Sequence, residues 1–141
     1  MGTMRILLSL CVLLALLPQA AHALRIYDNG RSRTASPAAL RRMERTLTRA
    51  GQQTWRTNPL SVANAATWNL LGGSRWRLDS SGLARRVLTS RRGRSQAIYQ
   101  VTRAGGTMAT ARLTVSRRAY QMTLRRPLAR AWYVTGVRRV K

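Results

Sequence analysis

Residues 107–116 read TMATARLTVS, and their polarity alternates from one residue to the next. The positions on one side of an extended chain are all apolar: Ala109, Ala111, Leu113 and Val115. The positions on the other side are mostly polar: Met108, Thr110, Arg112 and Thr114. Successive side chains of a β-strand point to opposite faces, so this period of two predicts a strand with one buried and one wetted face.

Stretches with the same alternation lie on both sides of this segment, and turn signals such as Ala104-Gly105-Gly106 separate them. They are RWRLDSSG (75–82), LARRVLTS (83–90), QAIYQVTR (96–103), AYQMTLRR (119–126) and RAWYVTGVRRV (130–140). Short links favour pairing between strands that follow each other in the chain. We therefore predict a four- to five-stranded antiparallel meander with one apolar face.

Two helices are predicted before the meander. The first, 36–51, has Ser36 as a candidate N-cap and Pro37 at its first helical position. The second, 58–71, repeats this chemistry with Asn58 followed by a proline, and it carries no charge, which indicates burial. We therefore predict an α+β fold in which two N-terminal helices pack across the apolar face of the sheet.

The predicted domain organisation is simple. Residues 24–35 form a flexible lead-in or a short strand at Leu24–Tyr27, and residues 36–141 form a single basic α+β domain. The order of two helices followed by a meander is similar in outline to the small basic toxin ribonucleases of the RelE type and to cystatin-like sheets. This likeness covers most of the mature chain, but it rests on the order of elements and not on a sequence motif. A shared fold does not by itself imply a shared function.

The first 23 residues have the three parts of a secretory signal peptide. Arg5 gives a positive start, an apolar run extends from Ile6 to Leu17, and Ala21 and Ala23 are the small residues of a cleavage site. The run is shorter than the roughly 20 residues that a spanning helix needs. We predict cleavage after Ala23 and a secreted or periplasmic protein, with retention as an anchor as the alternative.

Cleavage would remove the only cysteine, Cys11, and the only histidine, His22. The mature chain then has no thiolate or imidazole for a metal site, a nucleophilic triad or a Cys-His dyad. Its three acids, Asp28, Glu44 and Asp79, lie on separate segments, which disfavours catalysis by paired carboxylates. We therefore predict a protein that is not an enzyme and that has no cofactor, no metal and no small-molecule substrate.

The net charge is the strongest functional signal in the sequence. The chain has 26 basic and three acidic residues, a formal charge of +23, and every base except Lys141 is arginine. Arginine forms bidentate hydrogen bonds with phosphate, sulfate and carboxylate, and a large excess of charge supplies affinity by counterion release. The leading hypothesis is an exported, non-enzymatic domain that binds a lipid phosphate, lipopolysaccharide, a wall polymer or extracellular nucleic acid.

The candidate contacts are arginine clusters at the meander turns, where neighbouring strand ends meet. They are Arg91, Arg92, Arg94, Arg117, Arg118, Arg125 and Arg126. The second choice is a line of arginines on the first predicted helix: Arg41, Arg45 and Arg49.

Two alternatives stay open. The chain could be an assembly subunit of an envelope or secretion complex, meeting a protein partner through the neutral 58–71 helix or a sheet edge. It could also be a ribonuclease that works without histidine, with Tyr99, Tyr120, Arg112 and Arg118 as participants.

Overall fold

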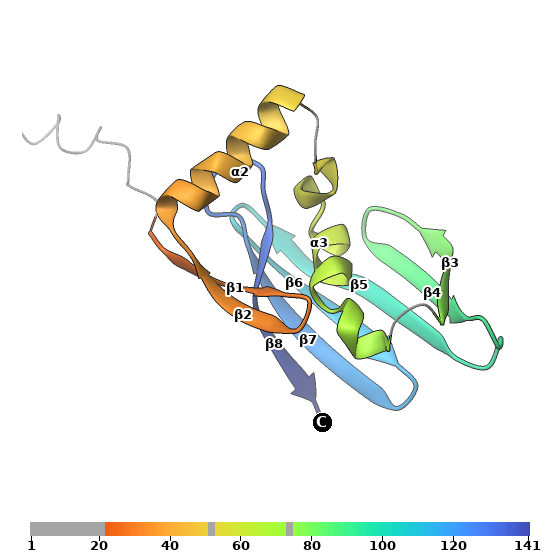
Figure 1. Ribbon diagram of the computed structural model, residues 1–141. Coiled ribbons are helices and arrows are strands. Elements are labelled where there is room, and N and C mark those ends of the chain that lie inside the picture. The colour runs from red at the N-terminus through yellow and green to blue at the C-terminus, as the bar shows by residue number, and fades with distance from the viewer. Residues whose placement is uncertain (1–21, 51–52, 73–74) are drawn as a thin grey trace, which may run out of the picture.

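A long antiparallel sheet forms the body of the molecule (Figure 1). The computed structural model describes residues 22–50, 53–72 and 75–141, which form eight strands in two sheets, two α-helices and two short 3-10 helices. The main sheet has six strands in chain order: β3 (Trp76–Ser81), β4 (Arg85–Ser90), β5 (Gln96–Gly105), β6 (Met108–Val115), β7 (Arg118–Arg125) and β8 (Tyr133–Val140). The helical segments are α2 (Pro37–Ala50), η1 (Thr54–Thr57), α3 (Pro59–Ala66) and η2 (Trp68–Leu71).

The predicted fold class is wrong. Instead of two helices on a four- to five-stranded meander, the described residues contain a six-stranded and a two-stranded antiparallel sheet, and most of the structure is sheet. Two causes account for the difference. All six alternating stretches form strands of one sheet, where the prediction counted four or five, and residues 24–35 pair with each other as a hairpin of β1 (Leu24–Asp28) and β2 (Arg31–Ala35).

Helix α3 lies on the apolar face of the main sheet. The Asn58 side chain accepts a hydrogen bond from the amide of Leu60 at 2.8 Å, which confirms the predicted N-cap and satisfies a free donor of the first turn. Five of the eight helix residues are buried, and they pack against inward-facing side chains of the sheet such as Tyr99, Leu113 and Met122. This packing forms the main hydrophobic core.

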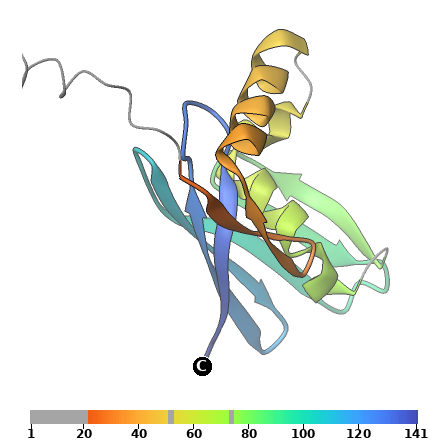
Figure 2. The same cartoon turned by 60° about the vertical axis from the view of Figure 1, so that its left-hand side comes forward.

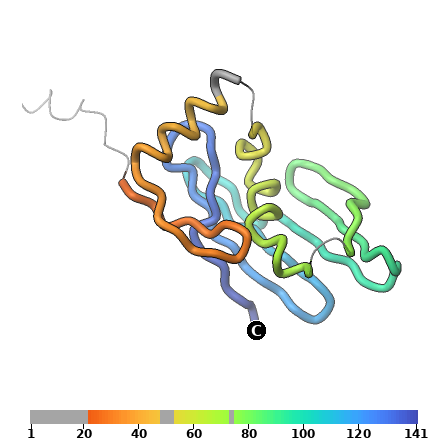
Figure 3. Tube along the Cα trace, viewed as in Figure 1, coloured from red at the N-terminus to blue at the C-terminus, as the bar shows by residue number. Residues whose placement is uncertain are grey.

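Helix α2 packs in a different place. Leu40 and Leu47 join Ile26 of β1, and Ala131 and Tyr133 near the start of β8, in a second, smaller core. Figure 2 shows α2 standing clear of the main sheet, and Figure 3 shows the β1–β2 hairpin between this helix and the last strand. The expectation that both helices cover the sheet is therefore wrong for α2, because its apolar stripe is used against the hairpin and the loop before β8.

The hairpin begins at Leu24, the residue after the predicted cleavage point. Its turn contains Asn29 and Gly30, both with positive φ. Gly30 has φ +80°, which favours glycine, and a Cβ there would lie 2.5 Å from the amide nitrogen of the Asn69 side chain, which would have to move. Residues 1–21 of the predicted signal peptide lie outside the described residues, and export stays a prediction.

Candidate anion-binding site

The turn between β4 and β5 carries the first predicted arginine cluster. The Ser90 hydroxyl oxygen accepts hydrogen bonds from the amides of Arg94 and Ser95, each at 3.2 Å, and the Gly93 amide donates to the Ser90 carbonyl at 2.7 Å. Gly93 has φ +68°, a conformation that suits glycine. The backbone of this turn is therefore held by its own hydrogen bonds, while the side chains of Arg91, Arg92 and Arg94 are exposed.

These three arginines line one side of an open pocket of about 600 Å³. Arg75 joins them, and its carbonyl accepts a hydrogen bond from the Arg91 amide at 2.7 Å. We call these four residues the turn cluster: Arg75, Arg91, Arg92 and Arg94. None of the described residues that line the pocket is a carboxylate. The turn cluster therefore presents four positive charges to one volume with no acidic group among them.

The pocket also has an apolar wall. Trp76 and Leu71 line it, and the indole N–H of Trp76 donates to the Leu71 carbonyl at 2.6 Å. This hydrogen bond fixes the ring, and Trp76 also packs against the main core. Its half-buried position therefore gives Trp76 a part in both the core and the pocket.

The other predicted arginines divide between the two ends of the sheet. Arg117 and Arg118 lie at the β6–β7 turn, next to the turn cluster, because β5 and β6 are neighbours and Ala97 pairs with Val115 at this end (Figure 1). Arg125 and Arg126 lie at the opposite end, where the Arg126 guanidinium donates to the Gly106 carbonyl at 2.6 Å. The structure thus brings five of the seven predicted residues to one end.

Arg126 serves the fold more than the surface. Its guanidinium lies 5.2 Å from the centre of the Trp132 ring, and its Nε atom is buried. The second-choice arginines lie on α2, away from the main sheet (Figure 2). Arg41 and Arg45 are exposed there, and the side chain of Arg49 lies outside the described part of the chain.

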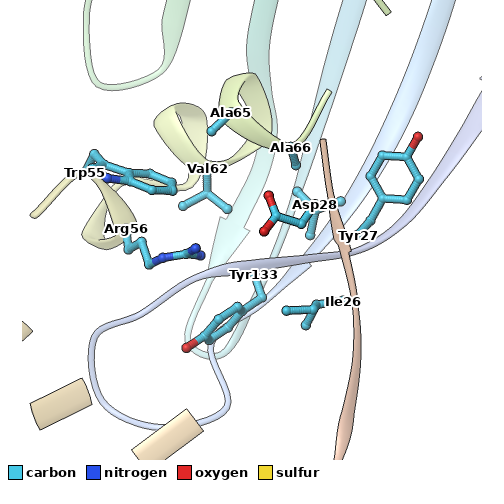
Figure 4. Close-up of a pocket in the computed structure, with 10 residues that line it drawn as sticks. Ile26, Tyr27, Asp28, Trp55, Arg56, Val62, Ala65, Ala66 and Tyr133 are labelled. Atoms are coloured by element: carbon cyan, nitrogen blue, oxygen red, sulfur yellow. The ribbon is translucent and has the colours of Figure 1, made fainter. Parts of the chain in front are cut away.

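Arg56 is an ordered arginine that sequence reasoning missed. The Arg56 guanidinium lies 4.5 Å from the Trp55 ring centre and 5.4 Å from that of Tyr133, and it extends toward Asp28 (Figure 4). Burial lowers the pKa of Arg56. Its carbonyl accepts from the Trp132 amide at 2.9 Å. The neighbouring tryptophan was visible in the sequence, but the contact with the last strand was not.

The residues suggested for a ribonuclease do not form one site. Tyr99 is fully buried, and its hydroxyl lies 3.1 Å from the buried Thr67 hydroxyl. Arg112 is exposed on the opposite face of the sheet, as the alternation along β6 requires. Tyr120 is half-buried against the core, and Arg118 is exposed at the start of β7.

The described residues contain neither a metal-binding cluster nor a membrane-spanning helix. No three His, Cys, Asp or Glu side chains within residues 22–50, 53–72 and 75–141 gather as the ligands of a metal ion would. In the same part of the chain, no helix has the length and apolar character needed to cross a bilayer. Comparison with known protein families, characterised proteins and solved structures finds no match to this chain.

Proposed function

We propose that the chain is an exported, non-enzymatic domain that binds an anionic polymer or anionic surface through the turn cluster. The observation that carries the proposal is the open pocket of about 600 Å³, whose described lining residues include four arginines and no carboxylate. Guanidinium groups bind phosphate, sulfate and carboxylate through paired N–H donors. No acidic side chain in the described part of the chain pairs with the turn cluster, so these donors are available to an external anion.

A polyanion fits this surface better than a single small anion. Arg117 and Arg118 extend the positive surface to the next turn at the same end of the sheet. A polymer with several charges would contact both turns and release one condensed counterion for roughly each charge neutralised. Lipid phosphate, lipopolysaccharide, a wall polymer and extracellular nucleic acid all supply such charges.

A salt titration tests this function. The mature domain is titrated with heparin, duplex DNA and anionic phospholipid vesicles over a series of salt concentrations. For duplex DNA, log affinity should fall linearly with log salt, with a slope of about one per phosphate contact. Absence of binding to all three probes near physiological salt would overturn the proposal.

A charge-matched pair of variants tests the site. The first variant replaces Arg91, Arg92 and Arg94 with glutamine, and the second replaces Arg41, Arg42 and Arg45 of α2 with glutamine. Both lose three charges from exposed positions. We expect the first variant to lose about three units of salt slope on duplex DNA and the second to lose less than one. Equal losses would show that net charge, and not the turn cluster, governs binding.

The assembly alternative is favoured by a separate observation on the β3–β4 hairpin. Leu78 is 55% exposed and Leu83 is 85% exposed, beside the open edge of β3. Exposed leucines next to an unpaired edge suit contact with another chain. Sedimentation equilibrium of the mature domain and of its Leu83→Ser variant tests this: association of the parent that is weakened in the variant would support it.

A further inference from the structure

The strand register places five long polar side chains opposite one another in five adjacent strands. Arg85 of β4 pairs with Gln100 of β5, and Gln100 pairs with Arg112 of β6. Arg112 then pairs with Gln121 of β7, and Gln121 pairs with Arg138 of β8. We call this set the cross-strand row. It runs across the strands and alternates arginine with glutamine along its whole length.

All five side chains of the cross-strand row lie on the face of the main sheet opposite α3. The residues next to them along the strands face the core or α3, and side chains alternate between the two faces. In β5, β6 and β7 the neighbours that prove this are the buried Tyr99, Leu113 and Met122. In β4 the neighbour Arg86 donates to Asn64 of α3, and in β8 the neighbour Val137 packs against the core.

Among the residues that the structure describes, no acidic side chain forms an ion pair with the arginines of the cross-strand row. The chain has three acids, and two of them, Asp28 and Glu44, belong to the hairpin and α2. The third, Asp79, accepts a hydrogen bond from Thr89 at 3.2 Å, outside the row. Within the row, Arg138 donates to the amide oxygen of Gln121. The three guanidinium groups therefore keep donors for a ligand.

The spacing of the charges is regular. Like charges directly opposite each other on adjacent strands destabilise a sheet, and the glutamines prevent this contact. Adjacent strands lie about 4.8 Å apart, so successive arginines of the cross-strand row are about 10 Å apart. The row thus offers a positive charge at every second strand and an amide at each strand between.

The rows on either side have shorter or uncharged side chains for the most part. One flank consists of Val87, Ile98, Thr114, Ala119 and Val140. The other flank includes Arg103, Thr110 and Thr123. Neither flank contains an aromatic residue, and proteins that bind single-stranded nucleic acid depend on aromatic side chains to stack the bases. The surface therefore suits a polymer of hydroxyls and isolated anionic groups.

We propose that the cross-strand row binds an extended acidic polysaccharide laid across the strands, with one anionic group in each disaccharide. The anionic groups of the polysaccharide pair with Arg85, Arg112 and Arg138, and its hydroxyls form hydrogen bonds with Gln100 and Gln121. A disaccharide in an extended chain has about the length of two strand spacings, which is the repeat of the row. The inference rests on the proposed binding of a polyanion. It adds the chemical class of the ligand and a second contact surface.

The test uses hyaluronan oligosaccharides, which carry one carboxylate per disaccharide and no sulfate, and the mature domain. Arg112→Gln removes the central charge of the cross-strand row, and Arg77→Gln removes one exposed charge outside it. A charge-assisted hydrogen bond lost from the complex corresponds to about a tenfold rise in Kd. We expect this rise for Arg112→Gln and less than a twofold change for Arg77→Gln. Equal effects would overturn the proposal.

A second pair of variants tests the alternation itself. Gln100→Glu puts a carboxylate between Arg85 and Arg112, where it repels an anionic sugar. Gln96→Glu makes the same change at an exposed position of the same strand, outside the row. Hyaluronan binding should be lost in the first variant and kept in the second. Loss in both, or in neither, would contradict the inference, and unchanged thermal unfolding confirms that each variant is folded.

Two further measurements separate this inference from the proposed function. If the variant of the three turn arginines loses binding to heparin and DNA while the row variants bind hyaluronan as the parent does, only the inference fails. If the parent binds none of these polymers, both fail. A single-stranded DNA oligonucleotide that binds more tightly than hyaluronan, with the same dependence on Arg112, would assign the row to nucleic acid and overturn the saccharide.

Discussion

Glu44 connects helix α2 to the loop before β8. Its carboxylate accepts hydrogen bonds from the Arg130 amide at 3.0 Å and 3.2 Å and from the Ala131 amide at 2.8 Å. In the sequence this residue was only one of three scattered acids, with no sign of a partner far along the chain. A carboxylate that binds two backbone amides is a structural group, and it holds the smaller core together.

Replacing Glu44 should therefore destabilise the fold. We expect Glu44→Ala to lower the free energy of unfolding by about 2 kcal/mol, because two amides lose a charged acceptor. Asp79→Ala is the matched control. Asp79 accepts from Thr89 at 3.2 Å in an exposed pair, and its loss should cost less than about 1 kcal/mol. Urea unfolding measures both, and equal costs would show that the amide contacts of Glu44 contribute little.

Tyr99 gives stability a dependence on pH. Burial raises the pKa of Tyr99, and its hydrogen bond to Thr67 lowers it only in part. An unfolded tyrosine ionises near pH 10, so above about that pH the unfolded chain releases a proton that the folded chain keeps. The contribution of Tyr99 to the free energy of unfolding is complete below this pH and falls as the pH rises through and above it.

The prediction is tested by urea unfolding between about pH 8 and pH 11. The free energy of unfolding of the parent should fall over the upper part of this range, and that of Tyr99→Phe should fall less steeply. Burial also raises the pKa of Tyr133, so the double variant with Tyr133→Phe should give the flattest curve. Parallel curves for parent and Tyr99→Phe would contradict the assignment.

At the scale of elements, strands with strict alternation could be predicted and irregular ones could not. Strand β6 has every predicted inward residue buried. In β8 a strict period of two would put Val134 and Val137 on different faces, but a bulge against Thr123 and Leu124 adds a residue, and Val137 joins the core face. Strand β2 has four exposed residues in a row, so it carries no apolar pattern that could reveal it.

Helix starts could be predicted because their chemistry is local. Asn58→Ala should lower the free energy of unfolding by about 1 kcal/mol, since the amide of Leu60 loses its acceptor at the start of α3. Asn58→Asp keeps an acceptor oxygen and should stay close to the parent. Thermal or urea unfolding of the three proteins decides the matter, and an aspartate variant as unstable as the alanine variant would exclude capping as the cause.

At the scale of the whole molecule, the sequence predicted arginine clusters but not their arrangement. Successive turns of an antiparallel meander lie at alternate ends, which separates Arg125 and Arg126 from the other five arginines, and the prediction grouped all seven without using this rule. The cross-strand row depends on register between five strands, and bulges in β5 and at the β7–β8 pairing shift that register. Arg75 joined the turn cluster through a backbone contact with no sequence signal.

The molecule as a whole should be stabilised by salt. Its formal charge is +23, and the ion pair found among the described residues, Arg33 with Asp28, is exposed and has a distance of 3.8 Å. Repulsion between arginines therefore opposes the compact state, and it is screened beyond about 10 Å at 0.1 M salt. The urea midpoint should rise between about 10 mM and 500 mM sodium chloride, with an unchanged m-value because the same surface is exposed on unfolding.

Specific anion binding should add to this screening. At equal ionic strength, polyphosphate should raise the urea midpoint more than sodium chloride does, because the folded turn cluster holds four arginines together and should bind polyphosphate more tightly than the unfolded chain does. The variant with glutamine at Arg91, Arg92 and Arg94 should lose most of this excess, while the variant of the three α2 arginines keeps it. A midpoint that is insensitive to both salts would mean that the arginines are far enough apart, or well enough hydrated, for their repulsion to cost the fold little.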